Sequence, residues 1–117
     1  MKIHEIERHQ THPEHLEITL YLDPDLLWFK GHFAVQPLLP GVAQLDWVMH
    51  YAITLMAPGY RFHSIQNVKF AAPLLPDNTV TLILDWHPAR QMLSFSYQRH
   101  AGSERHTASS GKIRLCQ

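Results

Sequence analysis

The sequence predicts an α+β fold in which one helix is surrounded by about five antiparallel strands. Two observations carry this prediction. Apolar and polar residues alternate in several short segments, as half-buried strands require, whereas residues 40–56 form one long apolar stretch of helical length. Proline and glycine separate these segments. A chain of 117 residues has the usual size of one domain, so we expect residues 1–117 to form a single domain.

The strands are predicted from the positions of their apolar side chains. In residues 15–22, leucine and isoleucine occupy every second position, which places them on one face of a strand. The other segments show similar alternation or lie between turn-forming residues, with turns at 23–25, 87–90 and 101–103. The predicted strands are residues 15–22, 61–70, 79–86, 92–98 and 104–115.

Residues 40–56 are predicted to form the helix. Pro40 suits the first helical turn, where its missing N–H is not needed, and Pro58 with Gly59 ends the helix. The residues between are apolar on nearly all sides, which predicts a buried helix. Asp46 and His50 are four positions apart and therefore share one face of it.

Composition limits the partners and the compartment. Lysine plus arginine equals aspartate plus glutamate at 10 each, which argues against nucleic acid as the main partner. The apolar stretch is interrupted by polar residues and is too short to cross a membrane. The single cysteine, Cys116, permits no intrachain disulfide, and the charged N-terminus lacks the apolar core of a signal peptide. We therefore expect a cytoplasmic protein.

The N-terminal histidines do not predict a metal site. His4 and His9 are five positions apart, whereas a helical HExxH site needs four. We interpret this segment as a solvated terminus and expect no metal.

Three groups around the start of the helix have complementary chemistry. His32 precedes the helix and could act as a base near neutral pH. The unpaired amides around Gly41 can polarise a carbonyl. Asp46 is a carboxyl group in an apolar helix, and burial raises the pKa of such a group, as general acid catalysis requires. A base, an amide and an acid suffice for β-elimination beside a thioester.

The residues alone leave a second interpretation open. His32 could equally be an ordinary loop histidine, and Asp46 a structural carboxylate paired with His50. Spacing does not decide between these interpretations.

The run GHFAVQPLLPGVAQLD at residues 31–46 resembles the active-site motif of the 3-hydroxyacyl-acyl-carrier-protein dehydratases, which have the hotdog fold. NVKFAAPLLPDNTVTL at 67–82 resembles the strand, turn and strand that follow the helix in that family. The resemblance covers residues 15–115, and the sequence around Asp46 is most similar to that of dehydratases of aryl polyene pathways. It implies that His32 is the catalytic base, Asp46 the acid and Gly41 N–H the carbonyl donor, without a cofactor.

The resemblance also implies partners. It predicts a homodimer with the active site at the subunit interface and an acyl carrier protein that delivers the thioester. Lys30, Arg61, Lys69 and Arg90 could meet an acidic carrier, although their scatter along the chain favours a plain solvated surface. The residues expected to contact substrate are Phe33, Val42, Trp47 and His50.

Some positions depart from the family pattern. The acid is Asp46, as in the bifunctional dehydratase/isomerase branch, where other members have glutamate. His50 stands where glutamine is common, and Asp77 stands where the turn usually has glycine. An acyl thioesterase on the same fold, or a non-catalytic subunit that binds acyl chains, remain the alternative functions.

Overall fold

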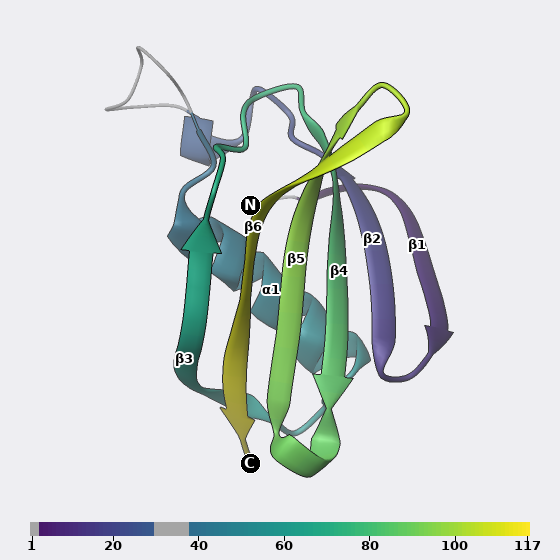
Figure 1. The fold of residues 1–117 in the computed structure, drawn as a ribbon, viewed down its shortest axis with the longest axis vertical. Coiled ribbons are helices and arrows are strands. Elements are labelled where there is room, and N and C mark those ends of the chain that lie inside the picture. The colour runs from purple at the N-terminus through teal and green to yellow at the C-terminus, as the bar shows by residue number, and fades with distance from the viewer. Residues whose placement is uncertain (1–2, 30–37) are drawn as a thin grey trace.

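The structure, a computed structural model, describes residues 3–29 and 38–117. Within these ranges the chain forms one six-stranded sheet and one α-helix (Figure 1). The elements in chain order are β1 (His4–His12), β2 (His15–Tyr21), the 3-10 helix η1 (Leu27–Phe29), α1 (Gly41–Leu55), β3 (Arg61–Phe70), β4 (Thr79–His87), the 3-10 helix η2 (Pro88–Arg90), β5 (Met92–Ala101) and β6 (Glu104–Cys116).

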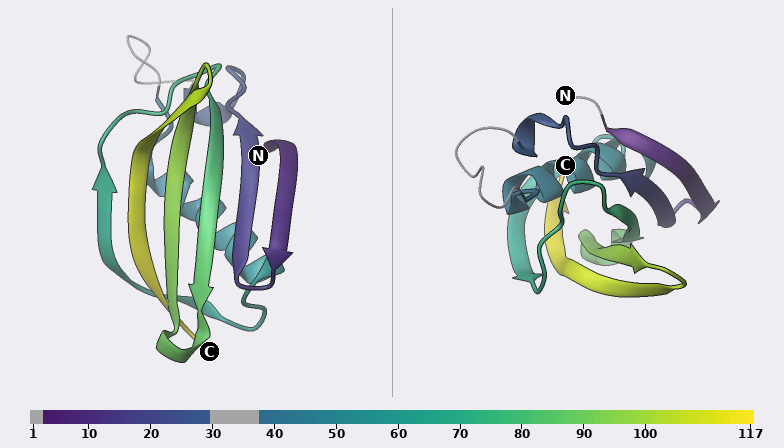
Figure 2. Two further views of the ribbon diagram at one scale, coloured as in Figure 1. Left: turned by 45° about the vertical axis from the view of Figure 1, so that its right-hand side comes forward. Right: turned by 90° about the horizontal axis from the view of Figure 1, so that it is seen from above.

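The sheet is antiparallel throughout, with the strand order β1-β2-β4-β5-β6-β3. It curves around α1, which lies against its concave face (Figure 2). This is the hotdog arrangement that the sequence predicted. No helix in the described part of the chain combines the length and hydropathy that crossing a membrane requires.

The alternating segments form the core as predicted. In β2 and the residue after it, Leu16, Ile18, Leu20 and Leu22 are fully buried. Alternate residues of β4 and β5 face the same core, and Tyr97 is buried among them. These strands lie in the middle of the sheet, where one face packs against the helix and the other faces outward.

The sheet has one strand more than the sequence predicted. Residues 4–12, interpreted as a solvated terminus, form β1, which pairs with β2. Every residue of β1 is exposed, so the strand lacks the apolar alternation by which strands are predicted. Its backbone pairing to β2, which local sequence does not encode, holds it at the edge.

The helix is buried on one side only, which corrects the prediction of a helix buried all round. Ala43, Trp47 and Tyr51 are among the residues that face the sheet. Val42, Asp46, His50 and Thr54 are exposed on the described chain. The apolar side chains Leu45, Met49 and Ile53 are partly buried against the core, so the exposed side is mainly polar and Val42 is its apolar residue.

Strand β3 lies at the opposite edge of the sheet from β1 and carries exposed apolar side chains. Phe62, Ile65 and Phe70 are each about half exposed, at 49%, 47% and 51%. They oppose Leu115, Ile113 and Ser109 of β6, which are buried, so all three face the concave side. Two irregularities in the register, after Phe62 and after Ile65, keep them on one face despite their odd spacings of three and five residues.

Asp77 takes the backbone conformation that glycine would supply in the turn before β4. Its φ is 71°, in the left-handed region. The hydroxyl of Tyr21 donates to the Asp77 carboxylate, and the backbone N–H of Leu75 donates to the side-chain oxygen of Asn78. Side-chain hydrogen bonds therefore hold a turn that lacks glycine.

Candidate active site

The start of α1 presents unpaired backbone amides. Pro40 is the N-cap and supplies no side-chain cap, while the N–H groups of Ala43 and Gln44 both donate to the Pro40 carbonyl at 3.1 Å. Within residues 3–29 and 38–117, the N–H groups of Gly41 and Val42 have no backbone or side-chain acceptor. Two donors at the positive end of the helix dipole are thus available to a carbonyl oxygen.

Gly41 lies directly against an aromatic ring. A Cβ atom added to Gly41 would lie 2.7 Å from Cζ of Phe70 and 3.2 Å from its Cε1 and Cε2. The absence of a side chain therefore lets the helix start approach the end of β3 closely. The predicted carbonyl donor and the exposed edge strand meet at this contact.

The predicted acid lies on the exposed side of the helix. Asp46 and His50 share one face, as their spacing predicted, and both are exposed. The ion pairs among the described residues do not include Asp46, so a structural Asp46–His50 pair is not present there. The predicted burial of Asp46 is wrong for the single chain.

Asp46 and His50 line a groove of about 720 Å³ between β1 and α1, which we call the β1–α1 groove. It is lined by Ile3, Glu5, Arg8, Asp46, Trp47, Met49, His50 and Tyr51. A volume of this order suits a small organic group. Apolar side chains of α1, Ile3 just before β1, and the Asp46 carboxylate line the same space.

Side-chain bonds from β1 hold this groove together. The Arg8 guanidinium donates twice to Glu5, at 2.8 and 3.2 Å, and lies 5.7 Å from the ring centroid of Tyr51. The Tyr51 hydroxyl donates to Glu5 at 3.0 Å, and Gln10 donates to the Leu55 carbonyl at 3.2 Å. The Arg8 hydrogen bond lowers the pKa of Glu5, and burial, followed by the Glu5 carboxylate, raises the pKa of Tyr51. Tyr51 therefore stays a neutral donor near neutral pH.

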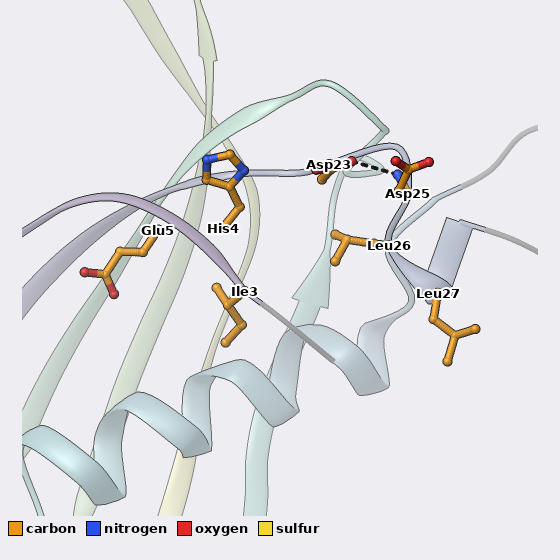
Figure 3. Close-up of a pocket in the computed structure, with 7 residues that line it drawn as sticks. All are labelled: Ile3, His4, Glu5, Asp23, Asp25, Leu26 and Leu27. Carbon is orange, nitrogen blue, oxygen red and sulfur yellow. Dashed lines mark hydrogen bonds between the residues drawn. The ribbon is translucent and has the colours of Figure 1, made fainter.

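A second, larger cavity of about 830 Å³ adjoins the groove (Figure 3). Ile3 and Glu5 line both, and the rest of the larger cavity comes from His4, Asp23, Asp25, Leu26 and Leu27. It contains none of the predicted site residues. We place the candidate site at the smaller groove, because Asp46, a carboxyl group suited to acid catalysis, lies there.

The structure brings together some of the predicted site residues and does not test others. Gly41, Val42, Asp46 and His50 lie on the described part of α1, whereas His32 and Phe33 lie outside the described residues. Trp47 is buried and serves both as core and as a wall of the groove. Val42 is 67% exposed, on the uncovered side of the helix.

Sequence reasoning missed the part of β1 that forms the groove. Ile3, Glu5 and Arg8 come from a segment without strand-like alternation, so no local signal identified them. It also did not assign a role to Gln44, although a polar side chain in a mostly apolar stretch is a signal that could have identified it.

Comparisons with known proteins agree with the fold and identify a family. The family described as ApeI-like, ApeI dehydratase, matches residues 7–112. The ApeI:P dehydratase heterocomplex from Xenorhabdus doucetiae contains a chain that is 55% identical, with a TM-score of 0.93 and 100% of each chain covered. An uncharacterized protein from Erwinia carotovora subsp. atroseptica is 53% identical, with a TM-score of 0.92, covering 99% of this chain and 97% of that one.

More distant structures share the fold. The dehydratase domain of the polyketide protein PpsC from Mycobacterium tuberculosis is 19% identical, with a TM-score of 0.70, covering 88% of this chain and 40% of that one. No curated protein matches the chain significantly. Because the family match spans residues 7–112 and two structures exceed half identity over almost the whole chain, the chain belongs to the ApeI-like dehydratase family, whose members are hydro-lyases.

Proposed function

We propose that the chain dehydrates a 3-hydroxyacyl thioester, carried on an acyl carrier protein, to the trans-2-enoyl thioester. The observation that supports this proposal most directly is the position of Asp46, an exposed carboxyl group in the β1–α1 groove of a chain from a dehydratase family. Similarity to ApeI and to polyketide dehydratase domains supports a role in aryl polyene or polyketide-like biosynthesis.

Each group has one task in this reaction. The base, which we assign to His32 from its place in the motif, removes the α-proton. The electron pair moves toward the thioester carbonyl, whose oxygen the Gly41 N–H stabilises. The bond to the β-hydroxyl then breaks as Asp46 donates a proton, and water leaves. The base therefore gains the α-proton, Asp46 loses the proton that leaves in water, and the proposed reaction uses no cofactor.

Residues of the groove and its surroundings would hold the substrate. We assign Trp47 and Val42 to the acyl chain, together with Phe33 from the motif. His50 lies one turn after Asp46 on the same face, where it can hydrogen-bond to substrate or to the acid. The flat apolar wall of Trp47 favours an extended or conjugated chain over a strongly branched one.

We further propose that the active chain is a homodimer joined through β3. Phe62, Ile65, Phe70 and Val42 form an exposed apolar surface, which we call the partner face. Strand β3 is also an edge strand, so its outer backbone groups can pair with a second β3. A second chain here would cover Val42 and the start of α1, where the Gly41 N–H lies. A different subunit is the alternative partner, because a chain 55% identical to this one comes from a dehydratase heterocomplex.

The acidic carrier protein has a matching surface on the opposite side of the sheet. The register places Arg61, Lys69, Lys112 and Arg114 on the outward face of β3 and β6, and we call them the basic stripe. Strands β3, β5 and β6 contain one acidic residue, Glu104. Acidic and basic residues are therefore unevenly distributed over the sheet, although the net charge of the chain is zero. Residues that are scattered along the sequence are therefore gathered by the fold, which favours electrostatic attraction of an acidic protein.

The central experiment measures turnover of 3-hydroxyacyl carriers by mass spectrometry. Asp46→Asn and His32→Ala should each abolish loss of water while the folded protein keeps its circular dichroism spectrum. Near-normal dehydration by either variant would contradict the assignment. Release of free thiol without an enoyl product would identify a thioesterase, and activity that requires a second hotdog subunit would identify a partner protein.

Carrier docking is tested separately with two forms of the substrate. Lys112→Glu should raise the KM for the carrier-bound substrate several-fold at low salt, and should leave the KM for a pantetheine thioester unchanged. Arg105→Glu, outside the basic stripe, is the control. Equal effects of both variants, or an equal effect on both substrates, would exclude docking at the basic stripe.

A further inference from the structure

A buried polar network lies beneath the start of α1. Gln44 is 3% exposed, and its neighbours Ser109 and Tyr97 are also buried. The Ser109 hydroxyl donates to Oε1 of Gln44 at 2.6 Å, and Nε2 of Gln44 donates to the Leu39 carbonyl at 3.1 Å. The Tyr97 hydroxyl donates to the backbone carbonyl of Gln44 at 2.6 Å.

The orientation of the Gln44 amide follows from these partners. A backbone carbonyl only accepts hydrogen bonds, so the amide nitrogen must face Leu39, and the oxygen is left for the Ser109 hydroxyl. Both ends of the amide are satisfied inside the protein. A buried polar group with this arrangement stabilises one geometry of the chain around it.

The network connects the sheet to the residues that precede the helix. Ser109 belongs to β6 and pairs with Phe70 of β3, whose ring contacts Gly41. Leu39 lies two residues before Gly41, and its N–H donates to the Leu74 carbonyl at 2.8 Å. Because the helix has no side-chain N-cap, Gln44 is the side chain that bonds the helix to the segment leading into it.

We propose that Gln44 is a positioning residue for dehydration, holding the Gly41 N–H at the thioester carbonyl through Leu39. This inference rests on the proposed roles of Gly41 and Asp46. The bond restrains the two-residue segment from which the Gly41 amide projects. A displacement of about 1 Å in such a donor is enough to lower a rate by about a hundredfold.

The inference predicts a loss in kcat rather than in substrate affinity. Gln44→Leu keeps the volume and removes the bond to Leu39, so kcat should fall about tenfold or more while KM changes little. Thr81→Val is the matched control. Thr81 is equally buried and bonds Thr19 and His100 on the outward face, away from the helix. It should lower the melting temperature and leave kcat unchanged.

Gln44→Glu provides a rescue that a purely structural role would not show. Burial favours a protonated glutamic acid, which can donate to the Leu39 carbonyl, whereas the carboxylate cannot. The kcat of this variant relative to the wild type should therefore rise between pH 8 and pH 5.5. The kcat values are measured below the melting temperature of every variant, so that recovery of kcat is not confused with refolding.

The variants of Asp46 and Gln44 distinguish failure of the proposed function from failure of the positioning role. If Asp46→Asn retains turnover, the proposed function fails. If Asp46→Asn is inactive but Gln44→Leu matches the kcat of Thr81→Val and Gln44→Glu has no pH-dependent recovery, the positioning role alone is overturned. Should Gln44→Leu not fold, Ser109→Ala decides, since it removes only the hydroxyl that orients the amide: a lowered kcat supports the inference, and an unchanged kcat overturns it.

Discussion

Replacing Ile65 with aspartate tests whether β3 joins two chains. Ile65 is in the middle of β3 and is 47% exposed on the partner face. In an antiparallel pairing of two β3 strands about their middle, a two-fold axis brings each Ile65 close to its own copy. Ile65→Asp would then place two carboxylates beside each other in an apolar interface.

The size of the effect follows from burial and charge. Full burial of an isoleucine contributes about 1.5–3 kcal/mol, so burying its exposed half contributes about 1 kcal/mol per chain, or about 2 kcal/mol per dimer. Like charges placed together at an interface cost several kcal/mol more. A total of about 5 kcal/mol corresponds to a Kd raised by between about three and four orders of magnitude.

Sedimentation velocity and the dehydration assay measure the consequence. Ile65→Asp should sediment as a monomer at micromolar concentration and lose activity, since the proposed site needs two chains. Ile6→Asp is the matched control, because Ile6 is 53% exposed on β1 at the opposite edge. If Ile65→Asp stays dimeric and as active as Ile6→Asp, the proposed interface is wrong.

Three further changes have defined outcomes. The Asp85 hydrogen bond, and then that of Glu17, raises the pKa of His15 above 6.5, so the cluster contributes stability below pH 6.5 that is lost as the pH rises through the raised pKa. Between pH 5.5 and 8.5, the free energy of unfolding in urea should change by about 1 kcal/mol less for His15→Gln than for the wild type. An identical change in both proteins would refute this. Gly41→Ala should lower kcat about tenfold or more by displacing the Phe70 ring, and Phe70→Ala in the same chain should restore part of it unless the contact is unimportant. Tyr51→Phe should reduce the free energy of unfolding by about 1 kcal/mol through loss of the Glu5 bond, and no change would mean that this bond does not hold β1.

The inner strands of the fold could be predicted because burial imposes a period of two on their side chains. Leu82 and Leu84 face the core because one face of β4 is covered, and that pattern is local. Strand β1 has no such pattern, since all its residues are exposed and its place depends on pairing with β2. The groove could not be predicted for the same reason, because its residues from β1 lie some forty positions before Asp46 in the sequence. Spacing predicted the shared face of Asp46 and His50, but not that this face is exposed.

The uncovered side of α1 explains both the correct and the wrong expectation about Asp46. The apolar side chains Leu45, Met49 and Ile53 are partly buried against the core, whereas Asp46 and His50 lie on the exposed and mainly polar side. Val42, at 67% exposure, is the apolar residue on that side that residues 3–29 and 38–117 leave uncovered. The apolar residues around Asp46 pack in the interior of the domain, and the signal for assembly is Val42 together with the exposed apolar residues of β3. Because the proposed active form is a dimer joined at these residues, dehydration should depend on protein concentration near the dissociation constant of the dimer.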